Sequence, residues 1–296
     1  MGAVAFVFSG QGDQFPGMGK ELQERYDSSK KVFQMCDGIR PGTSEQCFSG
    51  SADELKETKN TQPCLFAMEL AAFAVLQEKG ITPDAVAGFS LGEVVAATAA
   101  GYFDHETGFE LVCKRGALMQ AEAEKYDTAM AAVLKLSSEK VEEICGRFSH
   151  IYPVNYNCPG QISVSGLAEQ MPAFSAEVKA AGGRALPLKV KGAFHSPFMQ
   201  TAAVQFAEEI RKCEIRKGNV TLYSNLSGQP YGEDVVSQLS RQIANPVLWE
   251  TTIRNMIDSG IDTFIEIGPG KTLTNMIRKI SSDVNAKSYT ELLSEE

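Results

Sequence analysis

The residue types and spacing best suited to chemistry lie at positions 88–92, where the sequence reads Gly-Phe-Ser-Leu-Gly. Residues 84–87 suit the end of a strand, and residues 93–97 favour a helix. In this strand-turn-helix context the two glycines permit a sharp bend, which exposes the Ser90 hydroxyl at a helix N-terminus. The pattern predicts a nucleophile elbow. The alternative is a glycine-rich turn with an incidental serine.

A serine nucleophile needs a base within hydrogen-bond reach, most often a histidine. The chain has three histidines. His105 lies among acidic residues at an expected helix start, and His150 lies in a loop, so neither has catalytic neighbours. His195 lies between a strand-like run and a proline-marked helix start. By elimination His195 is the candidate base, and a purely structural histidine is the alternative.

Composition excludes several classes of protein. A hydrophobic fraction of 43% with 22% charged residues is ordinary for a globular chain of 296 residues. The net charge of -9 disfavours nucleic acid as a partner. No stretch approaches the ~20 apolar residues of a membrane helix, and no basic segment typical of a secretory signal opens the chain. We therefore expect a soluble cytoplasmic protein with neither a nucleic-acid nor a membrane partner.

Cysteine usage indicates reduced thiols. The seven cysteines are scattered, odd in number and free of any Cys-x-x-Cys pair. This pattern argues against a zinc site and against a disulfide framework. We expect no metal and no cofactor.

Strands and helices alternate in the first third of the chain, with a strand at 4–8, helices at 19–36 and 61–79, and a strand leading to Ser90. Such alternation predicts an α/β fold with a parallel sheet, whose site lies at the C-terminal ends of the strands. Loops 9–12 and 268–270 also follow expected strands, so both should meet Ser90.

A segment with a different order of strands and helices interrupts this alternation. Its predicted elements follow the order βαββαβ, which is typical of a ferredoxin-like unit; they are strands at 129–134, 154–157, 161–165 and 184–190 and helices at 138–148 and 168–181. We expect a large α/β-hydrolase-like domain, residues 1–127 and 192–296, into which a small ferredoxin-like subdomain, residues 128–191, is inserted. His195 lies just past the exit from the subdomain.

The chain resembles the malonyl-CoA:acyl carrier protein transacylases of fatty acid and polyketide synthesis. Five landmarks, spread over nearly the whole length, carry this resemblance in the family's order: Gly-Gln-Gly-Asp-Gln at 10–14, Gly-Phe-Ser-Leu-Gly-Glu at 88–93, Arg115-Gly116 with Met119-Gln120, Ala-Phe-His-Ser-Pro at 193–197, and Gln242 to Trp249 leading to Gly-Pro-Gly at 268–270. Each landmark alone is weak, but together and in register they are specific.

The resemblance implies a ping-pong acyl transfer. Ser90 attacks malonyl-CoA, His195 takes its proton, and the malonyl-serine ester passes to the phosphopantetheine thiol of acyl carrier protein. In the family, backbone N–H groups matching Gln11 and Leu91 hold the oxyanion. A backbone carbonyl near Gln242, rather than an aspartate, orients the histidine. The expected partners are therefore a coenzyme A thioester and acyl carrier protein, and we expect a monomer.

The same resemblance assigns the substrate contacts. Arg115 matches the residue that binds the malonyl carboxylate, for which a guanidinium gives a bidentate fit. Phe194 implies selection of malonyl over methylmalonyl units. Met119, Asn157 and Gln161 match further residues around the acyl group.

One position departs from the family pattern, because Phe89 stands where a histidine usually precedes the serine. That histidine is not the dyad base, so we expect an altered packing under the elbow and an intact mechanism.

Two other enzymatic or binding functions share single features of this chain. A serine thioesterase or hydrolase would share the elbow, but it normally carries its histidine late in the chain, and none follows His195. A nucleotide-binding module is suggested by Gly10-x-Gly12, but the third glycine of that fingerprint is replaced by Phe15. A noncatalytic scaffold that merely retains the elbow is a third possibility, which the presence of Ser90, His195 and Arg115 together disfavours.

Overall fold

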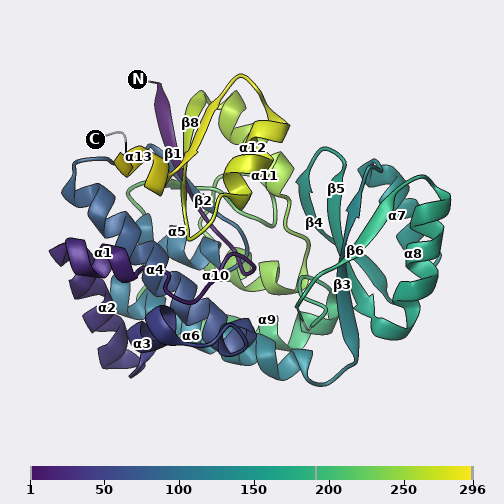
Figure 1. The fold of residues 1–296 in the computed structure, drawn as a ribbon, viewed down its shortest axis with the longest axis horizontal. Helices are drawn as coiled ribbons and strands as arrows, with labels where there is room; N and C mark the ends of the chain where they lie inside the picture. Colours follow the sequence, from purple (N-terminus) through teal and green to yellow (C-terminus); the bar gives the residue numbers. More distant parts are fainter. Residues whose placement is uncertain (1, 191, 295–296) are drawn as a thin grey trace.

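Two β-sheets organise the chain in the computed structural model, which describes residues 2–190 and 192–294 (Figure 1). The larger sheet is parallel and has the strand order β7-β2-β1-β8-β9. Its strands are β1 (Ala3–Phe8), β2 (Ala85–Gly88), β7 (Thr221–Leu222), β8 (Ile261–Ile267) and β9 (Asn285–Ser288). Since β2, β1 and β8 are neighbours, the loops that follow them lie at one edge of the sheet. Loop 9–12 lies against the Ser90 turn as predicted, whereas loop 268–270 lies against Ser9 and Asp13.

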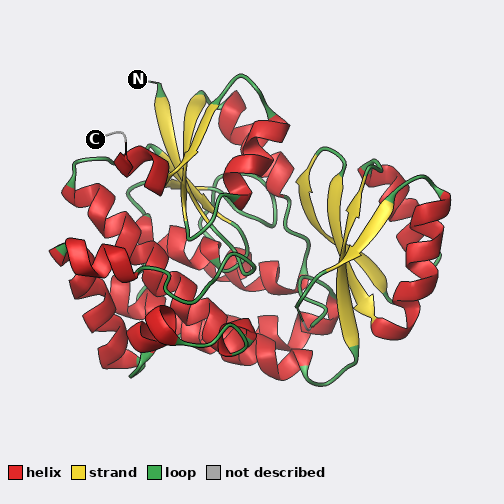
Figure 2. Ribbon diagram, in the orientation of Figure 1, coloured by secondary structure: helices red, strands yellow, loops and turns green. Residues whose placement is uncertain are grey.

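Helices cover both faces of the parallel sheet (Figure 2), so its central strands are apolar on both sides. Alternate residues of β1 point to opposite faces. Phe6 and Phe8 join the core on the α4 side, where both rings contact Phe73. Ala5 and Val7 join the second core, which α11 and α12 cover. Apolar packing on both faces therefore holds the sheet in place independently of the polar site residues.

The helices of this part are mostly short, with two long exceptions, α4 and α6. They are α1 (Lys20–Arg25), α2 (Asp27–Ile39), α3 (Thr43–Ser49), α4 (Thr58–Glu78), α5 (Gly92–Ala99), α6 (His105–Ala123), α9 (Gln200–Arg211), α10 (Val235–Arg241), α11 (Trp249–Asp258), α12 (Thr272–Ile280) and α13 (Tyr289–Ser294). The single helix expected at 19–36 is two helices, because the backbone is extended at Tyr26.

The second sheet is antiparallel and has the order β4-β5-β3-β6. Its elements follow the predicted βαββαβ sequence: β3 (Thr128–Leu134), α7 (Ser138–Cys145), β4 (Ile151–Cys158), β5 (Gln161–Leu167), α8 (Met171–Ala180) and β6 (Arg184–Pro187). Helices α7 and α8 lie on the side away from the parallel sheet (Figure 1). Strand β6 ends earlier than expected, at Pro187, and the predicted boundary at residue 191 lies outside the described residues.

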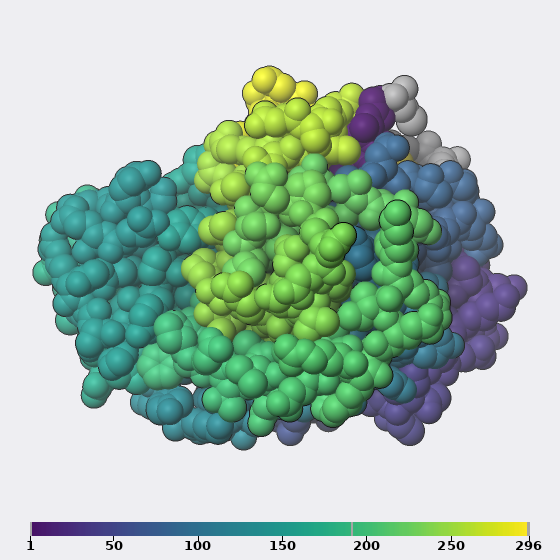
Figure 3. Space-filling model, turned by 180° about the vertical axis from the view of Figure 1, so that it is seen from behind, coloured from purple at the N-terminus to yellow at the C-terminus, as the bar shows by residue number. Residues whose placement is uncertain are grey.

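Backbone hydrogen bonds join strand β4 of the antiparallel sheet to the segment that precedes α11. Tyr156 N–H donates to Val247 O at 2.9 Å, and Val247 N–H donates to Val154 O at 2.9 Å. Seen from behind, the chain from α9 to α11 fills the middle of the molecule and abuts the small antiparallel part (Figure 3). Among the described residues, no helix is long and apolar enough to cross a membrane.

Candidate active site

Ser90 occupies a strained turn between β2 and α5. Its φ of 56° is in the left-handed region, which costs a non-glycine residue on the order of 1–3 kcal/mol. The Ser90 N–H donates to Asn225 Oδ1 at 2.7 Å, which fixes the turn. Packing requires glycine at both flanking positions. A Cβ on Gly88 would overlap the backbone at the start of α5, and a Cβ on Gly92 would overlap the backbone at the end of β1. The predicted strand-turn-helix elbow is therefore present.

His195 and Ser90 form a hydrogen-bonded pair. His195 Nε2 lies 2.7 Å from Ser90 Oγ, and His195 Nδ1 lies 2.7 Å from Gln242 O. Since a carbonyl can only accept, Nδ1 carries the proton and Nε2 presents its lone pair to the serine. Burial, and then the positive charge of Arg115, lower the pKa of His195 to about 4. The imidazole is consequently neutral at pH 7 and can accept a proton.

Arg115 brings a fully buried positive charge to the serine. Its guanidinium donates to Gln62 Oε1 at 2.8 Å, Gln242 Oε1 at 2.9 Å and Ser90 Oγ at 3.2 Å. Burial lowers its pKa to about 10, so it stays charged at neutral pH. Among the described residues, Arg115 Nε has no acceptor. A buried cation with an unused donor suits an anionic group of a ligand.

Gln242 acts through its side chain as well as its carbonyl. Gln242 Nε2 donates to Ser90 O and to Glu93 Oε2, each at 2.8 Å. Glu93 also accepts from Tyr231 Oη at 2.6 Å and from the Asn225 N–H at 3.0 Å, and burial raises its pKa to about 7. This buried network locks the dyad and Arg115 into one arrangement.

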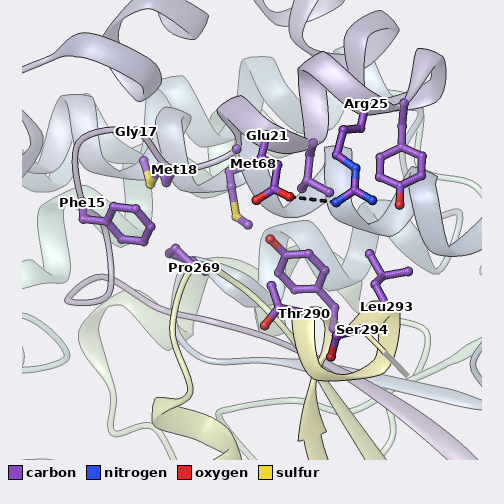
Figure 4. A pocket seen from close by; sticks show the side chains of 14 residues that line it. Phe15, Gly17, Met18, Glu21, Arg25, Met68, Pro269, Thr290, Leu293 and Ser294 are labelled. Atoms are coloured by element: carbon purple, nitrogen blue, oxygen red, sulfur yellow. Dashed lines mark hydrogen bonds and ion pairs between the residues drawn. The ribbon is translucent and has the colours of Figure 1, made fainter. Parts of the chain in front are cut away.

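The residues beside Ser90 enclose a cavity of about 90 Å³. They are Gln11, Gln62, Phe89, Leu91, Met119, Met130, Asn155, Leu188, Val190, Phe194 and His195. A larger cavity, about 420 Å³, lies between α1, Pro269 and α13 (Figure 4), and neither Ser90, His195 nor Arg115 lines it. Ser90 and His195 therefore belong to the smaller cavity. Arg115 is not one of its lining residues, but its guanidinium lies 3.2 Å from Ser90 Oγ.

Most residues singled out from the sequence come together here, including Gln11, Leu91, Met119 and Phe194. Arg115 and Gln242 contact Ser90 without lining this cavity, and Asn157 and Gln161 do not line it either. Asn157 Nδ2 donates to Ser163 Oγ at 3.3 Å, and Gln161 Oε1 accepts from Lys279 Nζ at 3.4 Å. Asn155, on the same strand, lines the cavity instead, so a substrate contact for Asn157 and Gln161 stays a prediction.

Sequence reasoning missed the residues that hold the site, namely Gln62, Glu93 and Asn225. The position of Glu93, directly after the elbow in the first turn of α5, could have indicated a role in the site. Nothing in the local sequence around Gln62 or Asn225 indicates one, because their partners are far away in the sequence.

Phe89 lies beside the elbow and lines the cavity at Ser90. Its ring packs edge-on against Trp249, with centroids 5.5 Å apart. The backbone of loop 9–12 lies directly against it, because a Cβ on Gly10 would meet Phe89 O at 2.8 Å. The Ser90–His195 hydrogen bond forms without any contribution from this side chain.

The chain is similar over nearly its whole length to known acyl transferases. The acyl transferase domain model matches residues 5–293. The malonyl CoA-acyl carrier protein transacylase of Bacillus subtilis is 38% identical over 289 residues, which are 95% of this chain and 91% of that protein. The Synechocystis protein of the same name is 36% identical over 291 residues, covering 98% and 97%.

Solved structures agree with this likeness. The malonyl CoA-acyl carrier protein transacylase of Clostridium perfringens superposes with a TM-score of 0.95 at 36% identity, over 99% of this chain and 96% of that one. A malonyl transacylase in complex with its type II polyketide acyl carrier protein superposes with a TM-score of 0.95 at 31% identity, over 99% and 100%.

Proposed function

The chain belongs to the family of acyl transferase domains, and we propose that it is a malonyl-CoA:acyl carrier protein S-malonyltransferase. The observation that carries this function is the buried Arg115 guanidinium, 3.2 Å from the Ser90 hydroxyl that His195 can deprotonate. An acyl group that ends in a carboxylate places its anion on Arg115 while its thioester carbon lies at Ser90. Malonyl groups have this form.

In the first half-reaction, Ser90 Oγ attacks the thioester carbon while His195 Nε2 takes its proton. The N–H groups of Gln11 and Leu91 stabilise the resulting oxyanion. When the intermediate collapses, the C–S bond breaks and the coenzyme A sulfur takes the proton from His195. The products are free coenzyme A and a malonyl ester of Ser90.

In the second half-reaction, the phosphopantetheine thiol of acyl carrier protein gives its proton to His195 and attacks the ester carbon. The C–O bond to Ser90 then breaks, and His195 returns the proton to Ser90 Oγ. Atoms and charges balance without a metal or a redox cofactor. The enzyme is therefore proposed to need only its thioester donor, malonyl-CoA, and its thiol acceptor, acyl carrier protein.

The finer points of the proposal concern selectivity and surroundings. Phe194 lines the cavity beside Ser90 and is proposed to exclude a methyl branch on the acyl group. A monomer in the cytoplasm, where malonyl-CoA and the carrier protein meet, completes the proposal.

The competing function is hydrolysis, in which water rather than a thiol accepts the malonyl group. The test is incubation with malonyl-CoA and holo acyl carrier protein, with the apo carrier as the matched control, followed by mass spectrometry of the carrier and of free malonate. We expect malonyl-carrier to accumulate only with the holo form. Release of malonate at the same rate with either carrier would identify a hydrolase.

A further inference from the structure

One face of α4 contacts the active site at several points. Thr58, Gln62 and Glu69 are spaced four and seven residues apart, which places them on one face of a helix. Gln62 Oε1 accepts from Arg115, and Thr58 Oγ1 accepts from the Gln11 side chain at 3.4 Å. Glu69 is the remaining polar member of this face, and the mechanism above gives it no role.

Glu69 forms a buried hydrogen bond with Ser9. The Ser9 hydroxyl donates to Glu69 Oε1 at 2.5 Å, and both residues are fully buried. The Ser9 N–H donates to Ile267 O at 3.1 Å. Gly268 leaves the space that the Ser9 hydroxyl occupies, because a Cβ there would overlap it. Ser9 is therefore fixed through both its backbone and its side chain.

Ser9 lies in the same loop, residues 9–12, as Gln11, whose N–H is assigned to the oxyanion hole. Gln11 is two residues further along, and Gly10 between them packs against Phe89, the residue before the nucleophile. On the other side, a Cβ on Gly92 would meet Ser9 O. Because the loop and the elbow are in van der Waals contact, a shift of Ser9 changes where the Gln11 N–H lies relative to Ser90.

We propose that the Ser9–Glu69 hydrogen bond sets the position of the Gln11 N–H in the oxyanion hole, so that Glu69 is a positioning residue for acyl transfer. The inference rests on the proposed function only in taking Ser90 as the acylated residue. Glu69 touches no substrate in this account and acts through Ser9.

The surroundings of Glu69 are buried and acidic. Burial raises the pKa of Glu69 well above its ordinary value, the hydrogen bonds from Ser9 lower it, and the nearby Asp13 and Glu266 raise it. Among the described residues, its Oε2 has no partner. Glu266 differs, since its carboxylate accepts from the N–H groups of Leu273 and Thr274 at the start of α12. Glu266 therefore serves as a matched buried acid without a contact to Ser9.

The test uses single-turnover acylation at saturating malonyl-CoA, together with the dissociation constant of malonyl-CoA. Removing an oxyanion donor outright costs ~10²–10³ in kcat, so a displaced donor should cost roughly tenfold or more. We expect Ser9→Ala and Glu69→Met to slow acylation by that factor with unchanged binding. The double variant should be no slower than either single one, because both lose the same hydrogen bond.

Two further variants separate positioning from general stability. Glu69→Gln keeps an acceptor for Ser9 and should recover most of the rate lost in Glu69→Met. Glu266→Gln should lower the unfolding temperature without slowing acylation. Acylation by p-nitrophenyl acetate, a small active ester, reads the same oxyanion hole without any malonyl group, so the test stands even if the protein does not transfer malonyl units.

The inference is overturned if Ser9→Ala acylates at the wild-type rate, if the losses lie only in substrate binding, or if the two single effects multiply in the double variant. Should Glu69→Met fail to fold, the Ser9→Ala rates with both substrates decide alone.

Discussion

Replacing Arg115 with lysine should separate recognition of the substrate carboxylate from the chemistry at Ser90. The change keeps the positive charge but loses the planar fork. The guanidinium reaches both Gln62 and Gln242, at 2.8 Å and 2.9 Å, and still lies beside Ser90 Oγ. A lysine ammonium cannot donate hydrogen bonds to both amides and also form two parallel hydrogen bonds to a carboxylate.

The magnitude follows from the number of charged hydrogen bonds lost. A hydrogen bond to a charged group contributes about 1.5–3 kcal/mol, and about 1.4 kcal/mol is a factor of ten. Loss of one bond to the malonyl carboxylate should therefore lower kcat/KM for malonyl-CoA roughly ten- to hundredfold. Acetyl-CoA, which has no carboxylate, should lose less or even gain.

The assay is transfer from each thioester to the same carrier protein, with kcat/KM measured for both. Arg254→Lys is the matched control, because Arg254 lies on the surface of α11 and pairs with Glu250 alone within the described part of the chain. It should change neither value. Equal losses for malonyl-CoA and acetyl-CoA would refute the assignment and make Arg115 a structural part of the Gln62–Gln242 network.

Four further predictions concern specificity, the general base and the pH dependence. Phe194→Ser should raise the methylmalonyl-to-malonyl ratio of kcat/KM by roughly tenfold or more, since one methylene is worth ~1–3 kcal/mol in a pocket; an unchanged ratio in a competition assay would place the choice elsewhere. His195→Ala should slow acylation ~10²–10⁴-fold, and full turnover at neutral pH would require another base. Acylation needs neutral His195, whose pKa is about 4, so the single-turnover rate should be flat from about pH 5.5 to 7 and fall as the pH drops through about 4. Because the charge of Arg115 helps to lower that pKa, Arg115→Gln should move the acid limb to higher pH, and an unmoved limb would contradict this electrostatic coupling.

The parts of the site that sequence could predict are those coded locally. The elbow at Ser90 needs glycines and a strand-to-helix switch within a few residues, so its geometry is visible in the motif itself. The parallel arrangement of the sheet follows from alternating strands and helices, and it places the loops around Gln11 and Ser90 at one edge. The position of His195 next to Ser90 needed elimination and family resemblance.

Long-range polar partners could not be predicted in this way. Gln62 lies 53 positions from Arg115, and Asn225 lies 135 positions from Ser90. No local periodicity links such pairs, because the contacts exist only after α4, α6 and the chain beyond β7 pack together. Side-chain placement along β4 also escaped prediction, since Asn155 and Asn157 share a face and only the fold decides which of them reaches the cavity.

The formation of a covalent malonyl ester tests the central claim most directly. The wild-type protein is incubated with malonyl-CoA in the absence of carrier, its intact mass is recorded, and the modified peptide is mapped. We expect one malonyl group on Ser90, its loss when holo acyl carrier protein is added, and no adduct on Ser90→Ala. A malonyl group on another residue, or labelling of Ser90→Ala at the wild-type rate, would contradict the account.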